Sequence, residues 1–395
     1  MIQRFHTTLL GTAARAFLFA ILCALAALLA ASFTSNMASE AFAADEEQGE
    51  IIDMSNTEGV PDVYLVVAPN LTWSAIDNDN TPNLQYLAGN NACANVITQD
   101  KVDIPGMKTY SNFHYTRINA IKMSQVDETV AAIYAGMDDM DALIITSSPA
   151  LAENPDYELP GYGVFIMVDA GDKGLLTSTT VRRSGLITSG NAAEAICSLL
   201  ESPQIKPGSL SIFAFTGLMG AIDRTTQMAR DNSIAVSIKD TEPFFYTVLL
   251  VVMGVTFLFS IVLLFLDIRI KPAFLRHMLP ATRILWIIAL SIPLASYLMF
   301  LQLPSFTTAE ITFDYFIFMV MELSFLSFII ALVFRWTYSL IFILSITVLT
   351  LVADQLLGGP MTATGYLSYA PIEAVRYYGL GNEGASLLFG SWIML

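Results

Sequence analysis

Residues 244–266 read FFYTVLLVVMGVTFLFSIVLLFL, a run of about 23 residues without a charged side chain. An α-helix rises about 1.5 Å per residue, so about 20 apolar residues cross a hydrocarbon core about 30 Å thick. Three further apolar runs follow, at about 284–303, 315–334 and 337–357. The sequence therefore predicts an all-α transmembrane region with about four spans, and the last apolar piece, 385–395, is about half the length of a fifth.

The negative charge of the chain is concentrated in one segment. The formal net charge is −16, and the charged residues between Asp45 and Glu242 sum to about the same value. This segment of roughly 200 residues is long enough to bury a core. Its acidity would repel nucleic acid and anionic lipid surfaces. We therefore expect no nucleic-acid partner, and we expect the lipid bilayer to surround the apolar runs.

The N-terminus has the order of a secretory signal. Arg4 and Arg15 precede the apolar stretch Ala16–Phe33, and small residues at 41–43 precede an acidic run. This order directs a chain to export, either as a cleaved signal peptide or as an uncleaved anchor. The expected organisation is a signal at 1–44, an acidic tether at 45–62, an exported domain at 63–242 and the membrane region at 243–395.

The connectors between the apolar runs give an independent prediction of topology. The basic residues of two connectors are Arg269, Lys271, Arg276, Arg283 and Arg335. In the opposite connectors, at 302–314 and 358–379, Arg376 is the only basic residue. Lys and Arg gather in cytoplasmic loops. The pattern therefore predicts a multi-pass protein of the plasma membrane with residues of about 45–242 outside the cytoplasm.

Short β-rich runs alternate with helical stretches in the exported domain. Strands are expected at 63–67, 92–98, 142–146, 163–168 and 210–215, and helices at 81–87, 125–135 and 189–201, with Thr81 as N-cap of the first. Alternation of this kind is typical of a parallel α/β sheet. Cys93 and Cys197 lie in this domain, either joined by a disulfide, which an exported domain permits, or as two small buried residues.

Four stretches carry a family resemblance: VYLVVAPNLTW at 63–73, TPNLQYLA at 81–88, DALIITSSP at 141–149, and 175–196 with Arg182 and Gly185. Their order resembles the alkaline phosphatase superfamily, which includes sulfatases and phosphoglycerol transferases. The resemblance implies a shortened form of that fold. The stretch YAPIEAVRYYGLGNE, at 369–383, resembles a motif of uncharacterised bacterial membrane proteins that join such a domain to many spans.

The residues that bind metal in this superfamily are missing here. Ala68 stands where the resemblance implies the first metal-binding Asp, and Ser147 and Ser148 stand where it implies Asp-His. Two-metal phosphoryl or sulfuryl transfer needs several carboxylate and imidazole ligands. We therefore predict no catalytic residue, metal or cofactor in a domain that binds or scaffolds. The alternative is an envelope phosphoryl or sulfuryl transferase or hydrolase with a remodelled metal site.

Two sets of charged residues are the remaining site candidates. Arg182 and Arg183 could contact an anion or form internal ion pairs. In the membrane region a charge is costly unless it is paired or hydrated. Glu322, Asp354, Arg376 and Glu383 are expected at similar depth near the outer surface. They form either a network that locks the spans or a site for a polar envelope substrate, which would make the protein a transporter with an accessory domain. An envelope polymer or a membrane protein is the expected partner.

Overall fold

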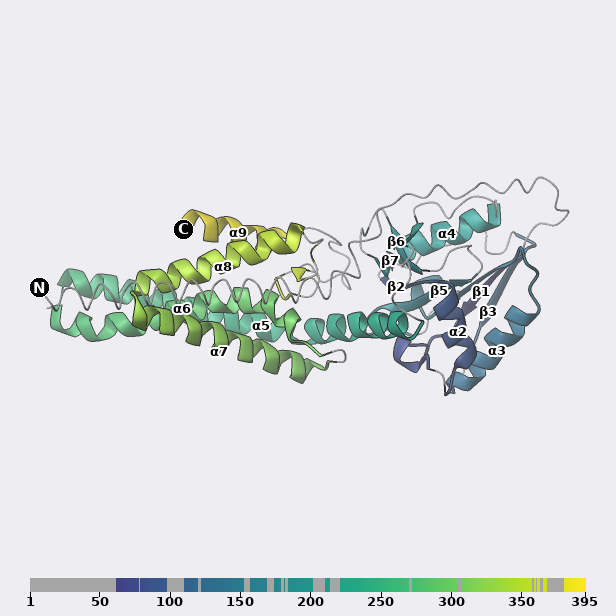
Figure 1. Cartoon of the computed structure of the whole chain (residues 1–395), viewed down its shortest axis with the longest axis horizontal. Helices are drawn as coiled ribbons and strands as arrows, with labels where there is room; N and C mark the ends of the chain where they lie inside the picture. The colour runs from purple at the N-terminus through teal and green to yellow at the C-terminus, as the bar shows by residue number, and fades with distance from the viewer. Residues whose placement is uncertain are drawn as a thin grey trace, which may run out of the picture.

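The computed structural model describes residues 62–77, 79–97, 110–119, 122–152, 157–168, 174–178, 181, 184–201, 210–213, 221–269, 272–304, 307–356, 359, 361–362, 365–367 and 380–395. An α/β domain stands at one end of an elongated molecule and a bundle of helices at the other (Figure 1). Helix α5 (Ala221–Arg269) belongs to both parts. The predicted signal and most of the predicted tether lie outside the described residues.

The α/β domain is built on one mixed sheet of eight strands. Its strands are β1 (Val63–Val67), β2 (Ala92–Ile97), β3 (Phe113–Arg117), β4 (Ala142–Thr146), β5 (Gly163–Val168), β6 (Gly174–Ser178), β7 (Leu186–Thr188) and β8 (Leu210–Phe213). The order is β3-β1-β4-β5-β2-β6-β8, and β7 pairs with β2. Two single turns of 3-10 helix, η1 (Trp73–Ala75) and η2 (Pro149–Leu151), follow β1 and β4.

The prediction of a parallel sheet is wrong in part. Strand β1 runs parallel to β3 and β4, but β5 runs antiparallel to both β4 and β2, and β8 runs antiparallel to β6. A parallel neighbour needs a crossover, usually with a helix that covers the sheet. The described part of the connection between β4 and β5 holds only η2. Strand β5 therefore returns beside β4 in the opposite direction.

Helices cover both faces of the sheet and give three layers. One face packs against α2 (Pro82–Asn90), α3 (Met123–Ala135) and the first half of α5, and the other packs against α4 (Ser189–Glu201). Cys93 points into the first core, whereas Cys197 on α4 packs against the second. The sheet lies between the two thiols, and they form no disulfide. Burial raises the pKa of the Cys93 thiol to about 12, so that thiol is a poor nucleophile.

A buried carboxylate from α3 caps the N-terminus of α2. Thr81 occupies the predicted cap position, but its side chain makes no cap hydrogen bond and donates instead to the carbonyl oxygen of Ala75 at 3.0 Å. The backbone N–H of Leu84 has no acceptor within α2 and donates to Oδ1 of Asp127 at 2.7 Å. The side-chain amide of Asn83 donates to Oδ2 of Asp127 at 2.7 Å. Asp127 thus replaces the local cap and joins two helices.

We expect Asp127→Ala to lower the free energy of unfolding of the α/β domain by about 1–3 kcal/mol, because the substitution leaves the buried backbone N–H of Leu84 without an acceptor. Asp127 is 3% exposed, whereas its neighbour Glu128 is exposed. Glu128→Ala is therefore the matched control and should change stability by less than about 0.5 kcal/mol. Thermal unfolding followed by circular dichroism measures both. Equal effects of the two substitutions would contradict the capping role of Asp127.

Four helices are long and apolar enough to cross a membrane, over residues Arg224–Phe265, Met278–Leu298, Ala309–Val333 and Trp336–Leu356. They belong to α5, α6 (Pro272–Leu298), α7 (Ala309–Val333) and α8 (Trp336–Leu356). The short turn η3 (Met299–Leu301) extends α6, and α9 (Asn382–Met394) packs beside α8. All four predicted spans coincide with helices. With 13 residues, α9 is too short to cross, as its sequence predicts.

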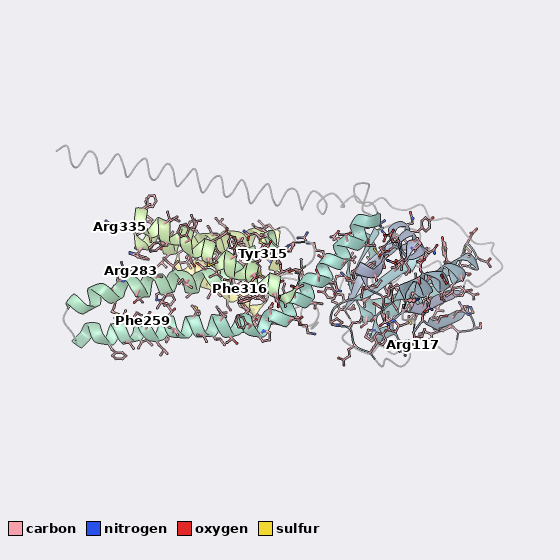
Figure 2. All side chains as sticks on the ribbon, turned by 90° about the horizontal axis from the view of Figure 1, so that it is seen from below. Arg117, Phe259, Arg283, Tyr315, Phe316 and Arg335 are labelled. Carbon is pink, nitrogen blue, oxygen red and sulfur yellow. The ribbon has the colours of Figure 1, made fainter. Side chains whose placement is uncertain are left out.

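The basic connectors lie at the end of the bundle that points away from the α/β domain. Figure 2 shows Arg335 and Arg283 toward that end, whereas Arg117 lies in the α/β domain. The guanidinium carbon of Arg283 lies 5.7 Å from the centre of the Trp336 ring. The two ends of the molecule therefore differ in charge, with the acidic domain at one end and the Lys/Arg connectors at the other.

Candidate functional site

The carboxyl ends of β1 and β4 are the place where the resemblance implies metal ligands. The two strands are parallel, with Val67 opposite Thr146, so Ala68 and Ser147 follow at the same edge of the sheet. The backbone N–H of Ala68 donates to the carbonyl oxygen of Thr146 at 2.8 Å. Both Ala68 and Ser147 are 1% exposed. The edge that holds ligands in the resembled hydrolases is therefore buried here.

Hydrogen bonds within the protein use the polar groups of this edge. The Ser147 hydroxyl accepts a hydrogen bond from the backbone N–H of Val164 at 2.9 Å. The Thr146 hydroxyl donates to the carbonyl oxygen of Val164 at 2.8 Å and accepts from the backbone N–H of Ser148 at 3.0 Å. Of the three hydroxyls at this edge, those of Thr146, Ser147 and Ser148, only the buried hydroxyl of Ser148 has no partner among the described residues. Hydrogen bonds of the Thr146 and Ser147 side chains thus join the end of β4 to the start of β5.

Gly163 shows how tightly this edge is packed. A Cβ at position 163 would lie 3.1 Å from both the backbone nitrogen and the Cα of Ser148. Real Cβ atoms rarely come so close to a backbone, so glycine permits β5 to begin against the turn that follows β4. The space beside Ser148 is thus filled by the main chain of the next strand.

The single histidine of the domain lies at the opposite edge of the sheet. Nε2 of His114 lies 3.3 Å from Oδ2 of Asp62, and its ring stacks on Tyr64 with centroids 4.7 Å apart. Partial burial and the nearby carboxylates, Asp62 first among them, raise the pKa of Tyr64. Asp141 accepts hydrogen bonds from the backbone N–H groups of Asp62 and Asp138, both at 2.9 Å. These side chains fix the amino ends of the strands and are remote from Ala68.

Arg182, Arg183 and Arg376 lie outside the described residues. Within the described part of the chain, no group of three His, Cys, Asp or Glu side chains is placed to hold a metal ion.

Glu322 makes no hydrogen bond with the two other members of the predicted membrane cluster that the structure describes, Asp354 and Glu383. It is exposed on the surface of α7, and Oε2 of Glu322 accepts a hydrogen bond from the Gln302 side chain at 3.2 Å. Asp354, in contrast, is 0% exposed at the last turn of α8. Glu383 is exposed in the first turn of α9. Among the described residues, no hydrogen bond joins Asp354 or Glu383 to Glu322.

Asp354 holds the chain where it leaves α8. Its carboxylate accepts hydrogen bonds from the backbone N–H of Met361 at 2.6 Å, the backbone N–H of Thr362 at 3.0 Å and the Thr362 hydroxyl. The amide of Gln355 lies 3.4 Å from the same carboxylate. Four donors therefore surround one buried acid, which is the arrangement of a structural anchor.

The sequence gives no prediction for the junction between α5 and the α/β domain. Asn95 on β2 accepts a hydrogen bond from the Trp73 indole N–H at 2.7 Å and donates to the carbonyl oxygen of Met228 on α5 at 3.3 Å. The Arg224 guanidinium donates to the carbonyl oxygen of Gly89 on α2. All of these groups are buried. The mixture of apolar and polar residues at 221–243 is the sequence feature that indicates an amphipathic helix packed against the α/β domain.

A second set of buried polar contacts lies where α5 enters the bundle. The Thr312 hydroxyl on α7 donates to the Ser237 hydroxyl on α5 at 2.9 Å. One turn further along α5, the Thr241 and Tyr366 hydroxyls lie 2.8 Å apart. The Tyr366 ring stacks on Phe245, with ring centroids 4.6 Å apart. Contacts of α5 thus continue without interruption from the sheet to the bundle.

No protein-family model matches the chain, and no curated protein or solved structure matches it.

Proposed function

We propose that this chain is a multi-pass protein of the bacterial cell envelope whose exported, phosphatase-like α/β domain binds or scaffolds other envelope components without catalysis. The observation that carries the proposal is the closed edge of the sheet. Ala68, Ser147 and Ser148 are buried there, and hydrogen bonds within the protein occupy the hydroxyls of Thr146 and Ser147. Phosphoryl or sulfuryl transfer needs an open site at which cations and substrate meet.

The continuous helix α5 supports a scaffolding role. It has 49 residues and is about 70 Å long at 1.5 Å per residue. Its buried contacts with β2 and α2 at one end, and with α7 at the other, hold the domain at a fixed position on the bundle. A binding surface carried in this way stays at a constant height above the bilayer and needs little ordering when a partner binds.

The transport alternative has less support from the side chains of the bundle. A transport site would bring ionisable groups into the bundle interior. Glu322 is exposed on α7, and the Asp354 carboxylate is already surrounded by donors from its own connector. The locking role of Asp354 is therefore the better supported of the two readings of this cluster.

Metal content and turnover test the proposal directly. The full-length protein, purified in detergent after growth with Zn²⁺ and Mn²⁺, is analysed by mass spectrometry for metals and assayed with aryl phosphate and aryl sulfate. We expect far less than one metal per chain and the same background turnover for the native chain and Ser148→Ala. Stoichiometric metal together with turnover that Ser148→Ala abolishes would overturn the proposal in favour of a remodelled hydrolase.

A further inference from the structure

The membrane half of α5 is much less covered than the other helices. In its most apolar window 11% of the residues are buried, compared with 44%, 33% and 39% in α6, α7 and α8. Its exposed side chains recur along one face. They include Leu250, Val251, Leu258, Val262 and Phe265, of which Leu250 is 70% and Leu258 63% exposed. One long apolar face of α5 thus has no protein neighbour among the described residues.

Gly254 stands in the middle of this face. A Cβ at this position would meet no atom within 4 Å. Glycine inside a helix costs about 1 kcal/mol relative to alanine, and nothing in the described bundle requires it here. In membranes, glycine and other small residues let two helix backbones approach closely. The α5 face therefore has the surface of a helix–helix contact.

We propose that the apolar segment Ala16–Phe33 of the same chain crosses the membrane beside α5 and packs on this face. The segment has no charged residue and is about 18 residues long, which is enough to span. Ala16, Ala20 and Ala24 are spaced by four residues, so a helix would present them on one side. These small residues complement the open surface at Gly254.

The covalent connection between the segment and the α/β domain favours this partner over a separate protein. Residues 34–62 connect the segment to β1, and Val66 of β1 shares a buried core with Met228 of α5. The segment is therefore confined near α5, and confinement in one chain raises its effective concentration at the α5 face. The inference rests on the proposed topology, which places Arg15 on the cytoplasmic side and makes the segment antiparallel to α5.

Cys23 makes the contact testable with a single substitution. Cys23 lies about 8 residues from Arg15, and Leu258 lies about 8 residues from the cytoplasmic end of the apolar run of α5, so both are about 12 Å into the membrane. We therefore expect Leu258→Cys, in a Cys197→Ala background, to form a disulfide with Cys23 when membranes are oxidised with copper phenanthroline. Val255→Cys is a second variant on the same face.

Phe325→Cys is the matched control, because this residue is exposed on α7 at a similar depth. The expected result is an intramolecular disulfide, identified by the mass of the joined peptides, that is several-fold more abundant for Leu258→Cys or Val255→Cys than for Phe325→Cys. Three results would overturn the inference: no such disulfide from either α5 variant, a disulfide that joins two copies, or a mature N-terminus beyond Phe33. If the α/β domain is found outside the cytoplasm, any of these three results refutes the packing of Ala16–Phe33 on α5 and leaves the proposed topology intact. An inverted topology refutes both.

Discussion

Replacement of Asp354 by alanine is expected to destabilise the helical bundle by about 3–5 kcal/mol. The substitution removes the acceptor of the backbone N–H groups of Met361 and Thr362 and of the Thr362 hydroxyl. These donors are buried, and water cannot replace the lost carboxylate without entry into the packed end of the bundle. Met361 and Thr362 should lose their fixed positions after α8 as well.

Unfolding in mixed micelles, followed by circular dichroism, measures this effect. Asp354→Asn keeps one acceptor oxygen and should lose about half as much stability. Leu356→Ala is the control two residues away, because Leu356 is 81% exposed, and it should change stability by less than about 0.5 kcal/mol. If Asp354→Ala is as stable as Leu356→Ala, the carboxylate is not the anchor that we infer.

Asn95→Leu should have the second largest effect, a loss of about 2–4 kcal/mol in the α/β domain. The substitution leaves the Trp73 indole N–H without its acceptor and the carbonyl oxygen of Met228 without its donor. Asn95 is 1% exposed, so both groups stay buried. Because Met228 is on α5, the contact of the domain with this helix should loosen, and limited proteolysis should cut the junction sooner.

A double-mutant cycle with Trp73→Phe separates the hydrogen bond from the change of shape. In the Trp73→Phe background the indole donor is already absent, so Asn95→Leu should cost about 1–2 kcal/mol less than in the native chain. Strict additivity of the two substitutions would contradict a direct coupling between Asn95 and Trp73. In that case the loss of stability in Asn95→Leu would come from altered packing and not from the lost hydrogen bond.

Most of the regular structure follows from apolar runs in the sequence. The four spans and the strands at Val63–Val67, Ala142–Thr146 and Gly163–Val168 are continuous apolar segments, and helix α4 has its predicted bounds. Strands β3, β6 and β7 were missed. Strand β3 is a half-buried edge strand of sequence FHYTR, and β7 has only three residues, so neither produces a clear apolar period.

The predicted domain boundary at 242/243 falls inside one helix. The boundary follows the point where charged residues stop, but the helix continues through Pro243 and α5 is a single element. Before Pro243, Arg224 and Met228 contact the α/β domain, whereas Ser237 already contacts the bundle. Most of the apolar residues after Pro243 are exposed on the outside of the bundle. A change in composition therefore marked a change of surroundings and not the end of an element.

The candidate site was predictable only in part. The motifs quoted for the resemblance indicate that strands end at Ala68 and Ser147. The hydrogen bond that buries the Ser147 hydroxyl comes from β5. The antiparallel direction of β5 beside β4 does not follow from the alternation of strands and helices. The sequence predicts Glu322 and Asp354 at a similar depth in the membrane. Whether they face one another depends on which side of its helix each occupies, and Glu322 is exposed whereas Asp354 is buried. Contacts between helices decide that, and a single sequence does not specify them.

Labelling from outside the cell tests the central claim, an acidic α/β domain displayed outside on a bundle with cytoplasmic Lys/Arg connectors. Asp139→Cys, exposed in the α/β domain, and Thr337→Cys, exposed at the start of α8, are made in a Cys197→Ala background and treated with a membrane-impermeant maleimide. We predict that intact cells label Asp139→Cys at once and Thr337→Cys only after permeabilisation. Labelling of Thr337→Cys in intact cells, with Asp139→Cys protected until permeabilisation, would contradict the account.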